Sequence, residues 1–272
     1  MSWWSWFGPS TPTAAPCLVM LEGNIGAGKT SLCRALARPP ALVRCEPETL
    51  SDAFQALFYA RPERYGFALQ MSMCATRHAA ARRDCAATRA RRAGVTVLDR
   101  SVLGDYAFAA YNYACGHLDD AEWAVYREAA GGDVCAALRR ATRGAAERVT
   151  LLYLRDTPEA CLSRAVQRGG ADAHALTLVY VHGLHVAHEA CVALARARCR
   201  DAVRVRVLDF ARYGAATRGG AEDVHAAHAL LRDVLVEGGD DNDDAERLAR
   251  QALSTLRSRR VRTRLASALG LE

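Results

Sequence analysis

The chain of 272 residues is long enough for one α/β domain with appendages, and 51% of its residues are apolar, so it can bury a sizeable core. Its net charge is +6, and this charge is unevenly distributed along the chain. The sequence contains no run of 18 apolar residues, so we expect no membrane span.

Ten cysteines lie at irregular spacings without a zinc-binding pattern. Several fall on apolar faces of expected helices, among them Cys33, Cys74, Cys161 and Cys191. We therefore predict reduced thiols and an intracellular compartment: the cytoplasm, or the host cytoplasm or nucleus for a viral protein.

Residues 1–16 are rich in Trp and then in Ser, Thr and Pro, and they lack the basic start and apolar core of a secretory signal. We predict a disordered N-terminal tail for this segment. The alternative is an aromatic segment that docks on this protein or on a partner.

A phosphate-binding P-loop follows, because an apolar strand at 17–21 runs into the pattern G-x-x-x-x-G-K-[ST] and then into a helix that reaches about residue 38. Backbone N–H groups of such a loop, together with the helix N-terminus, bind phosphate oxygens. The predicted phosphate-binding residues are Gly23, Asn24, Ile25, Gly26, Ala27, Gly28, Lys29 and Thr30.

Lys29 is the one lysine of the chain, since the other 35 of the 36 basic residues are arginines. A compact ammonium suits a tight loop better than a guanidinium fork. We expect Lys29 to contact the outer phosphates of the nucleotide and the Thr30 hydroxyl to hold Mg²⁺.

Polar residues follow two further apolar strands at the points where those strands end. Glu46 follows a strand at 41–45, and Asp99 and Arg100 follow a strand at 94–98. Ligands of parallel α/β sheets bind beyond the carboxyl ends of the strands. Glu46 could accept a proton from a substrate hydroxyl, Asp99 could support Mg²⁺, and Arg100 could neutralise a transferring phosphoryl group.

Two predicted helices carry further candidates. A long helix at 65–92 places Gln70 and Arg77 two turns apart on one face, where they either read a planar ligand or are simply solvated. A helix that starts at Thr157 and Pro158 places Arg164 and Arg168 one turn apart before a glycine pair. These arginines suit a lid over nucleotide phosphates or a solvated basic face.

The remaining pattern predicts helices at 122–140, 176–200 and 221–236 and strands at 148–154 and 203–209. The alternation of strands and helices indicates an α/β fold, a doubly wound parallel sheet of five strands flanked by helices. His182, His185 and His188 lie in the helix at 176–200, but His182 and His188 point about 120° apart, which argues against a metal site.

The C-terminal region consists of an acidic linker at 237–244 and an expected basic amphipathic helix at 245–272. Residues 247–264 contain seven arginines and no acid. We favour packing of this helix on its own protein or across a homodimer, and contact with nucleic acid or another partner is the alternative. We also expect deletion of 238–272 to leave activity largely intact.

Six sequence blocks occur in an order that resembles the deoxynucleoside kinase family, which includes deoxycytidine, deoxyguanosine and mitochondrial-type thymidine kinases. They are LEGNIGAGKTS, CEPE, YARPERYGFALQMSMCATR, LDRSVLGD, LYLRDTPEACLSRAVQRG and LHVAHE. The resemblance covers residues 17–236. It implies a P-loop kinase domain with a short arginine lid that uses ATP and Mg²⁺ to phosphorylate the 5′-hydroxyl of a deoxynucleoside for nucleotide salvage and DNA synthesis.

The same resemblance implies residue roles. Glu46 looks like the general base, and Lys29 and Arg100 complete the catalytic set. Asp99 and Thr30 look like the metal-binding pair, and Arg164 and Arg168 like lid residues on ATP. The implied substrate-binding residues are Glu46, Tyr59, Gln70, Met73, Arg77, Arg100, Asp105 and Phe108.

Substrate preference stays open at this point. The Arg77–Asp105 pair is similar to that of the deoxycytidine and purine kinases, whereas Met73 stands where a smaller residue is usual. Gly170 replaces a third lid arginine. The alternatives are a nucleoside monophosphate kinase of the thymidylate-kinase type and a non-catalytic nucleotide-binding protein.

Overall fold

The protein is represented by a computed structural model that describes residues 17–37, 43–46, 52–90, 95–145, 148–169, 175–217, 221–236 and 245–271. The predicted N-terminal tail at 1–16 and acidic linker at 237–244 lie outside these residues. The same holds for the side chain of Glu46, whose backbone alone is described.

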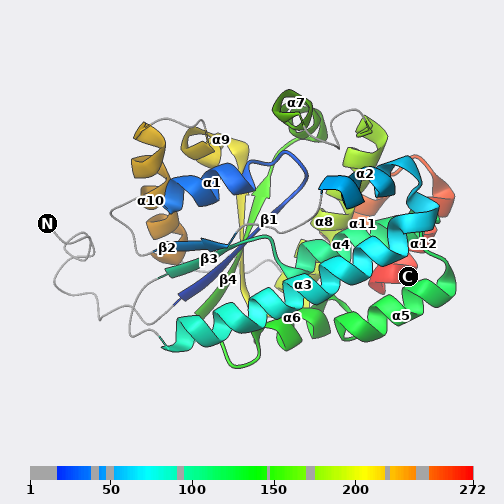
Figure 1. Ribbon diagram of the computed structural model, residues 1–272, viewed down its shortest axis with the longest axis horizontal. Coiled ribbons are helices and arrows are strands. Elements are labelled where there is room, and N and C mark those ends of the chain that lie inside the picture. Colours follow the sequence, from blue (N-terminus) through cyan, green and yellow to red (C-terminus); the bar gives the residue numbers. More distant parts are fainter. Residues whose placement is uncertain are drawn as a thin grey trace, which may run out of the picture.

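A five-stranded parallel sheet forms the centre of the molecule, as the sequence predicted (Figure 1). Its strand order is β2-β3-β1-β4-β5, and each neighbouring pair is parallel. The strands are β1 (Cys17–Gly23), β2 (Val43–Glu46), β3 (Val95–Asp99), β4 (Arg148–Arg155) and β5 (Arg204–Asp209). Because β1 is central and buried along its whole length, the loop that follows it begins at the middle of the sheet edge.

Two helical layers enclose the sheet (Figure 1). On one side α1 and α10 pack together, and on the other side α3, α4, α6 and α8 pack against one another. The principal helices are α1 (Lys29–Leu36), α2 (Asp52–Ala60), α3 (Pro62–Ala90), α4 (Val102–Cys115), α5 (Asp120–Ala130), α6 (Val134–Thr142), α7 (Pro158–Arg168), α8 (Leu178–Arg198) and α10 (Ala221–Val236). A short α9 (Phe210–Tyr213) and the 3-10 helix η2 (Gly214–Thr217) follow β5.

The single helix predicted at 122–140 is wrong, because the segment forms the two helices α5 and α6. Gly131 and Gly132 separate them with φ angles of 110° and 114°, which other residues rarely adopt. The Asp133 side chain then accepts a hydrogen bond from Ala136 N and begins α6. Two consecutive glycines followed by a capping residue explain the break.

The C-terminal region is also two helices rather than one, α11 (Ala245–Ser254) and α12 (Arg259–Leu269). Thr255 bonds back to the carbonyl of Ala252, and Ser258 caps α12 by accepting from Val261 N. Helix α11 packs on α8, and α12 packs on α4. The leucines on the buried side of these two helices and the turns that follow them are Leu253, Leu256, Leu265, Leu269 and Leu271.

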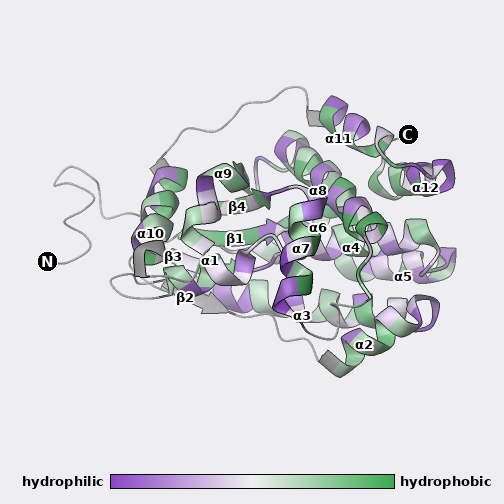
Figure 2. Cartoon of the chain, turned by 90° about the horizontal axis from the view of Figure 1, so that it is seen from above, coloured by the Kyte–Doolittle hydropathy of each residue, from purple (hydrophilic) through white to green (hydrophobic). Residues whose placement is uncertain are grey.

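This packing confirms the expectation that the C-terminal region folds onto its own protein. Figure 2 shows hydrophilic and hydrophobic residues alternating along α11 and α12, as expected for helices with one buried side. The region is therefore part of the described structure's core rather than an appendage.

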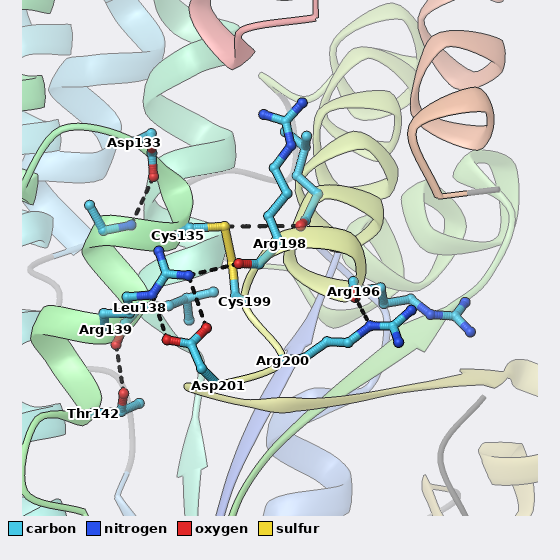
Figure 3. The surroundings of a disulfide bond; sticks show 12 residues. Asp133, Cys135, Leu138, Arg139, Thr142, Arg196, Arg198, Cys199, Arg200 and Asp201 are labelled. Carbon is cyan, nitrogen blue, oxygen red and sulfur yellow. Dashed lines mark hydrogen bonds and ion pairs between the residues drawn. A yellow bond between two sulfur atoms is a disulfide. The ribbon is translucent and has the colours of Figure 1, made fainter. Parts of the chain in front are cut away.

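The prediction that the cysteines are reduced is partly wrong. Cys135, in the first turn of α6, forms a disulfide with Cys199 at the C-terminal end of α8, beside the Arg139–Asp201 ion pair (Figure 3). Cys33 is disulfide-bonded as well. Cys74, Cys161 and Cys191 are free and buried, as predicted. Helix periodicity located the buried faces but carried no information on which distant sulfurs meet, so the inferred reducing compartment loses this support.

Helix α8 is long and apolar enough to cross a membrane by length and composition alone. However, 67% of its most apolar window is buried inside the protein, where it contacts α4, α6 and α11. These contacts are those of a core helix.

Candidate active site

The loop between β1 and α1 makes a tight turn. Gly26 and Gly28 adopt φ angles of 77° and 91°, and α1 begins at Lys29. A Cβ on Gly26 would lie 2.0 Å from the carbonyl oxygen of Cys161, so only glycine allows this approach to α7. Asn24 anchors the loop through a 2.9 Å hydrogen bond from Nδ2 to the carbonyl of Val181.

Lys29 lies at the centre of this loop and is 5% exposed. Its Nζ donates hydrogen bonds of 2.7 Å to the carbonyl oxygens of Gly23 and Asn24. The ammonium is thus held against the loop backbone, at the place where the sequence predicted phosphate oxygens.

Thr30 and Asp99 come together although 69 residues separate them. The Thr30 hydroxyl donates a 2.7 Å hydrogen bond to Oδ2 of Asp99. Oδ1 of Asp99 is buried and has no hydrogen-bond partner among the described residues. A hydroxyl and a carboxylate with a spare oxygen are hard oxygen ligands, so this pair fits Mg²⁺.

Arg100 is the one non-glycine residue of the described chain with a positive φ, 87°. Its backbone N–H donates a 3.1 Å bond to the carbonyl of Leu21 in β1. The guanidinium lies 5.5 Å from the ring centre of Phe108. Strained conformations of this kind persist where surrounding contacts fix them, often at functional sites.

Glu22 is a residue that the sequence interpretation did not select, although it is a charged residue at the end of an apolar strand. Its side chain is fully buried and accepts bonds from Gly23 N at 2.9 Å, Ser101 Oγ at 2.8 Å and Gly104 N at 2.9 Å. Burial raises its pKa, but the nearby His188 and the charges of Lys29 and Arg100 hold that pKa well below the usual value.

The predicted Arg77–Asp105 pair is present, with 3.5 Å between Nη1 and Oδ1. The Tyr126 hydroxyl donates a 2.7 Å bond to Oδ2 of the same carboxylate. Asp105 is 1% exposed and Arg77 11%, so the pair is buried rather than solvated. Burial and the nearby Asp105 raise the pKa of the Cys74 thiol to about 12, which keeps this neighbour neutral.

Gln70 is 2% exposed on the same helix, and its amide oxygen has no hydrogen-bond partner among the described residues. Met73 is buried in a small apolar cluster with Phe58 and Leu69. The solvated alternative for Gln70 is therefore wrong, and an unpaired buried amide oxygen is a group that a ligand can satisfy.

Two aromatic candidates occupy different surroundings. The Tyr59 ring meets Tyr180 edge-on at 6.3 Å. Phe108 contacts the guanidinium of Arg100, and its ring meets the ring of His188 edge-on with 5.5 Å between the ring centres.

Helix α7 begins as predicted, with the Thr157 side chain accepting from Ala160 N and Pro158 in the first turn. Arg164 Nε donates a 2.8 Å bond to the carbonyl of Gly26 in the P-loop, and its guanidinium lies 4.4 Å from the ring centre of Phe210. Arg168 is exposed in the last turn. The structure therefore brings Arg164 into contact with the loop, and Arg168 lies one turn further along the helix.

Glu46 is the last residue of β2, and its backbone pairs with Leu98 of β3, one residue before Asp99. The strand ends that carry Glu46 and Asp99 are thus neighbours. Both lie at the carboxyl edge of the sheet, as the sequence predicted.

A known protein family shares the part of the sequence that carries these features. A family-level sequence profile described as "Deoxynucleoside kinase" matches residues 19–214. The chain belongs to the deoxynucleoside kinase family.

Individual relatives are distant in sequence, and their names agree with this family. The kinase is 28% identical over 195 residues to deoxycytidine kinase 2 of Gallus gallus, which covers 63% of this chain and 72% of the relative. It is 27% identical over 198 residues to deoxycytidine kinase of Homo sapiens, with 63% and 73% covered. Mitochondrial deoxyguanosine kinase of Xenopus laevis is 27% identical over 191 residues, with 62% and 70% covered.

A solved structure of deoxyadenosine kinase from M. mycoides with bound dCTP has a similar fold, with a TM-score of 0.60 and 15% sequence identity. The match covers 81% of this kinase and 100% of the chain of that structure. At that identity the likeness establishes the fold. The family match establishes the kinase as an enzyme that phosphorylates deoxynucleosides with ATP as phosphate donor. Neither the monophosphate kinase nor the non-catalytic alternative has support.

The sequence argued against a metal site at His182, His185 and His188. Among the residues that the structure describes, no group of three His, Cys, Asp or Glu side chains could hold a metal ion. His188 is fully buried, and its Nε2 lies 3.5 Å from Oε1 of Glu22.

Proposed function

We propose that this kinase transfers the γ-phosphoryl group of ATP to the 5′-hydroxyl of a deoxynucleoside whose base carries an exocyclic amine, with deoxycytidine as the preferred substrate. The observation that carries the preference is the buried Arg77–Asp105 pair. The names of the relatives cited above, deoxycytidine kinases among them, support the same choice.

Asp105 is suited to recognise an amine because a carboxylate only accepts hydrogen bonds. Arg77 and Tyr126 each contact one of its oxygens, which fixes the position of the carboxylate. A base that presents a carbonyl oxygen at the same place would face a buried negative charge, which is costly. Gln70 lies on the same helix as Arg77 and can pair with a base edge through its amide.

The other roles follow from chemistry and position. Glu46 accepts the proton of the attacking hydroxyl, and Lys29 and Arg100 neutralise charge on the phosphoryl oxygens. Thr30 and Asp99 would hold Mg²⁺, which supplies charge neutralisation on the phosphates when it is bound. Tyr59 contacts the sugar, Phe108 packs on the base, and Met73 limits the size of the base site. Arg164 and Arg168 close over ATP.

We further propose that the kinase acts inside the cell as a homodimer in nucleotide salvage. Its co-substrate ATP is an intracellular metabolite, which supports the location. Sedimentation of the purified full chain would test the dimer, and a monomer at assay concentration would contradict it.

The base preference is tested by kcat/KM for deoxycytidine and thymidine. We expect the wild-type kinase to favour deoxycytidine by at least about 100-fold, because a buried polar group left unpaired costs about 1–3 kcal/mol and repulsion adds to it. Asp105→Ala should reduce this ratio to within about tenfold of one. Asp84→Asn, a change at a fully buried carboxylate of α3, is the matched control and should keep the ratio. A wild-type preference for thymidine would contradict the proposal.

A further inference from the structure

The turn after β3 holds Arg100 in a conformation that its own chain does not favour. The φ of 87° places it in the left-handed region, which costs a non-glycine residue free energy unless neighbouring contacts compensate. The residues on either side, Asp99 and Ser101, have their own partners in Thr30 and Glu22. The turn is therefore fixed from outside rather than by its local sequence.

Glu22 makes most of these outside contacts. Its Oε2 accepts from Ser101 N at 3.2 Å, Ser101 Oγ at 2.8 Å and Gly104 N at 2.9 Å, all within four residues after Arg100. Its Oε1 accepts from Gly23 N at 2.9 Å, the first residue of the P-loop. One carboxylate thus joins the phosphate loop to the turn that carries Arg100.

The fit around this carboxylate is close. A Cβ on Gly104 would lie 2.3 Å from Oε2 of Glu22, so a larger residue at this position of α4 would displace the carboxylate. The side of Oε1 is occupied by His188 of α8, whose Nδ1 donates a 2.7 Å bond to the carbonyl of Leu184 and whose Nε2 therefore faces Glu22 at 3.5 Å. The His188 ring also meets Phe108 edge-on, and Phe108 lies under Arg100.

We propose that Glu22 is a positioning residue for phosphoryl transfer: it holds Arg100 in register with the P-loop, so that the guanidinium and the loop act on the same phosphoryl group. The inference rests on the role proposed above for Arg100. Glu22 does not touch the reacting atoms, since its oxygens are already occupied by Gly23, Ser101 and Gly104.

Replacement by glutamine keeps the size of the side chain and breaks the arrangement. An amide has one accepting oxygen and one donating nitrogen, whereas both Glu22 oxygens face N–H or O–H donors. In either orientation of the amide, its NH₂ group faces an N–H or O–H donor on one side. The turn or the loop must then move, and displacement of a reacting group by about 1 Å can reduce the rate by about 100-fold.

The test is a double-mutant cycle of Glu22→Gln with Arg100→Ala, read as kcat and KM for deoxycytidine and for ATP. We expect Glu22→Gln alone to lower kcat about 100-fold and to change both KM values less than about threefold. In the Arg100→Ala background the same change should lower kcat less than about threefold, because the group that Glu22 positions is absent. Asp84→Asn should lower stability without lowering kcat.

An additive cycle, with about the same loss of kcat in both backgrounds, would overturn the inference and leave the role of Arg100 standing. A normal kcat for Arg100→Ala would overturn both the inference and the proposed role of Arg100. If Glu22→Gln does not fold, Ser101→Ala replaces it in the cycle, because it removes only the 2.8 Å bond from Oγ to Glu22 and the cap of α4. The same non-additivity with Arg100→Ala is expected, and additivity would overturn the inference.

Discussion

The Tyr126 hydroxyl donates a 2.7 Å hydrogen bond to Oδ2 of Asp105, and both residues are almost completely buried. Burial raises the pKa of Tyr126 well above its usual value, so the hydroxyl keeps its proton and remains a donor. Its ring stacks on Trp123, which stacks on Tyr113. Arg264 of α12 lies 4.2 Å from the centre of the Tyr113 ring. A stack of aromatic rings therefore connects the C-terminal region with the Arg77–Asp105 pair, which is proposed to recognise the base.

Removing the Tyr126 hydroxyl should weaken base selection without unfolding the protein. Tyr126→Phe keeps the contact of the carboxylate with Arg77, and the loss of one hydrogen bond to a charged group is worth about 1.5–3 kcal/mol. We expect the ratio of kcat/KM for deoxycytidine over thymidine to fall by about tenfold or more. The matched control is Tyr106→Phe, which removes a buried hydroxyl bonded to the carbonyl of Gly132 and should keep the ratio. Equal ratios in Tyr126→Phe and wild type would show that Asp105 needs no fixing by Tyr126.

Loss of the Thr30 hydroxyl should raise the requirement for Mg²⁺. Thr30 and Asp99 are joined at 2.7 Å, and Thr30→Ala leaves the carboxylate as the one proposed protein ligand. We expect the Mg²⁺ concentration for half-maximal rate to rise by at least about tenfold. Thr142→Ala removes a buried hydroxyl bonded to Leu138 and is the control. An unchanged Mg²⁺ titration would refute the metal role of Thr30.

The structure reverses one expectation about the C-terminal region. Deletion of 238–272 would expose the faces of α4 and α8 that α12 and α11 cover, and it would remove several buried leucines, each worth about 1.5–3 kcal/mol. We therefore expect the truncated chain to lose most of its stability and with it its activity. Replacing the exposed Arg257, Arg259 and Arg260 by Gln should leave melting temperature and turnover nearly unchanged. A folded, active truncation would contradict the packing described above.

Stability should fall between about pH 6.5 and pH 4 because of His78. Burial and the charges of Arg140 and Arg82 lower its pKa from 6.5 to about 4. In this window the unfolded chain binds the proton and the folded chain does not, so stability is complete above pH 6.5 and is lost as the pH falls towards 4. The shift corresponds to about 3 kcal/mol.

Urea unfolding at pH 7.5 and pH 5 would measure this loss in the wild type and in His78→Leu. The variant should lose less stability between the two values, and His225→Gln, a change at an exposed histidine, should behave as the wild type. His185, whose burial lowers its pKa to about 4, contributes in the same direction and remains in both variants. Identical pH dependence in wild type and His78→Leu would refute the assignment to His78.

The sequence predicted the parts of the site that depend on local pattern. The strand ends carrying Glu46 and Asp99, the P-loop with Lys29 and the start of α7 at Thr157 all follow from periodicity and from residues with fixed backbone preferences. The pairing of Arg77 with Asp105 came from the family resemblance, and the structure places the two side chains together.

The parts that the sequence did not reveal depend on contacts between distant segments. Glu22 receives bonds from residues 79 and 82 positions further along the chain, and Cys135 meets Cys199 across 64 positions. No local periodicity contains such pairings. The breaks at Gly131 and Ser258 were local signals, but continuous apolar spacing on both sides concealed them.

Transfer of labelled phosphate from ATP to the four deoxynucleosides and their monophosphates, with wild type and Glu46→Gln, tests the central claim most directly. We expect label in the monophosphate of deoxycytidine and a turnover about 10²–10⁴-fold lower in the variant, as for loss of a general base. Label appearing only in diphosphates, or a normal turnover of Glu46→Gln, would contradict the account.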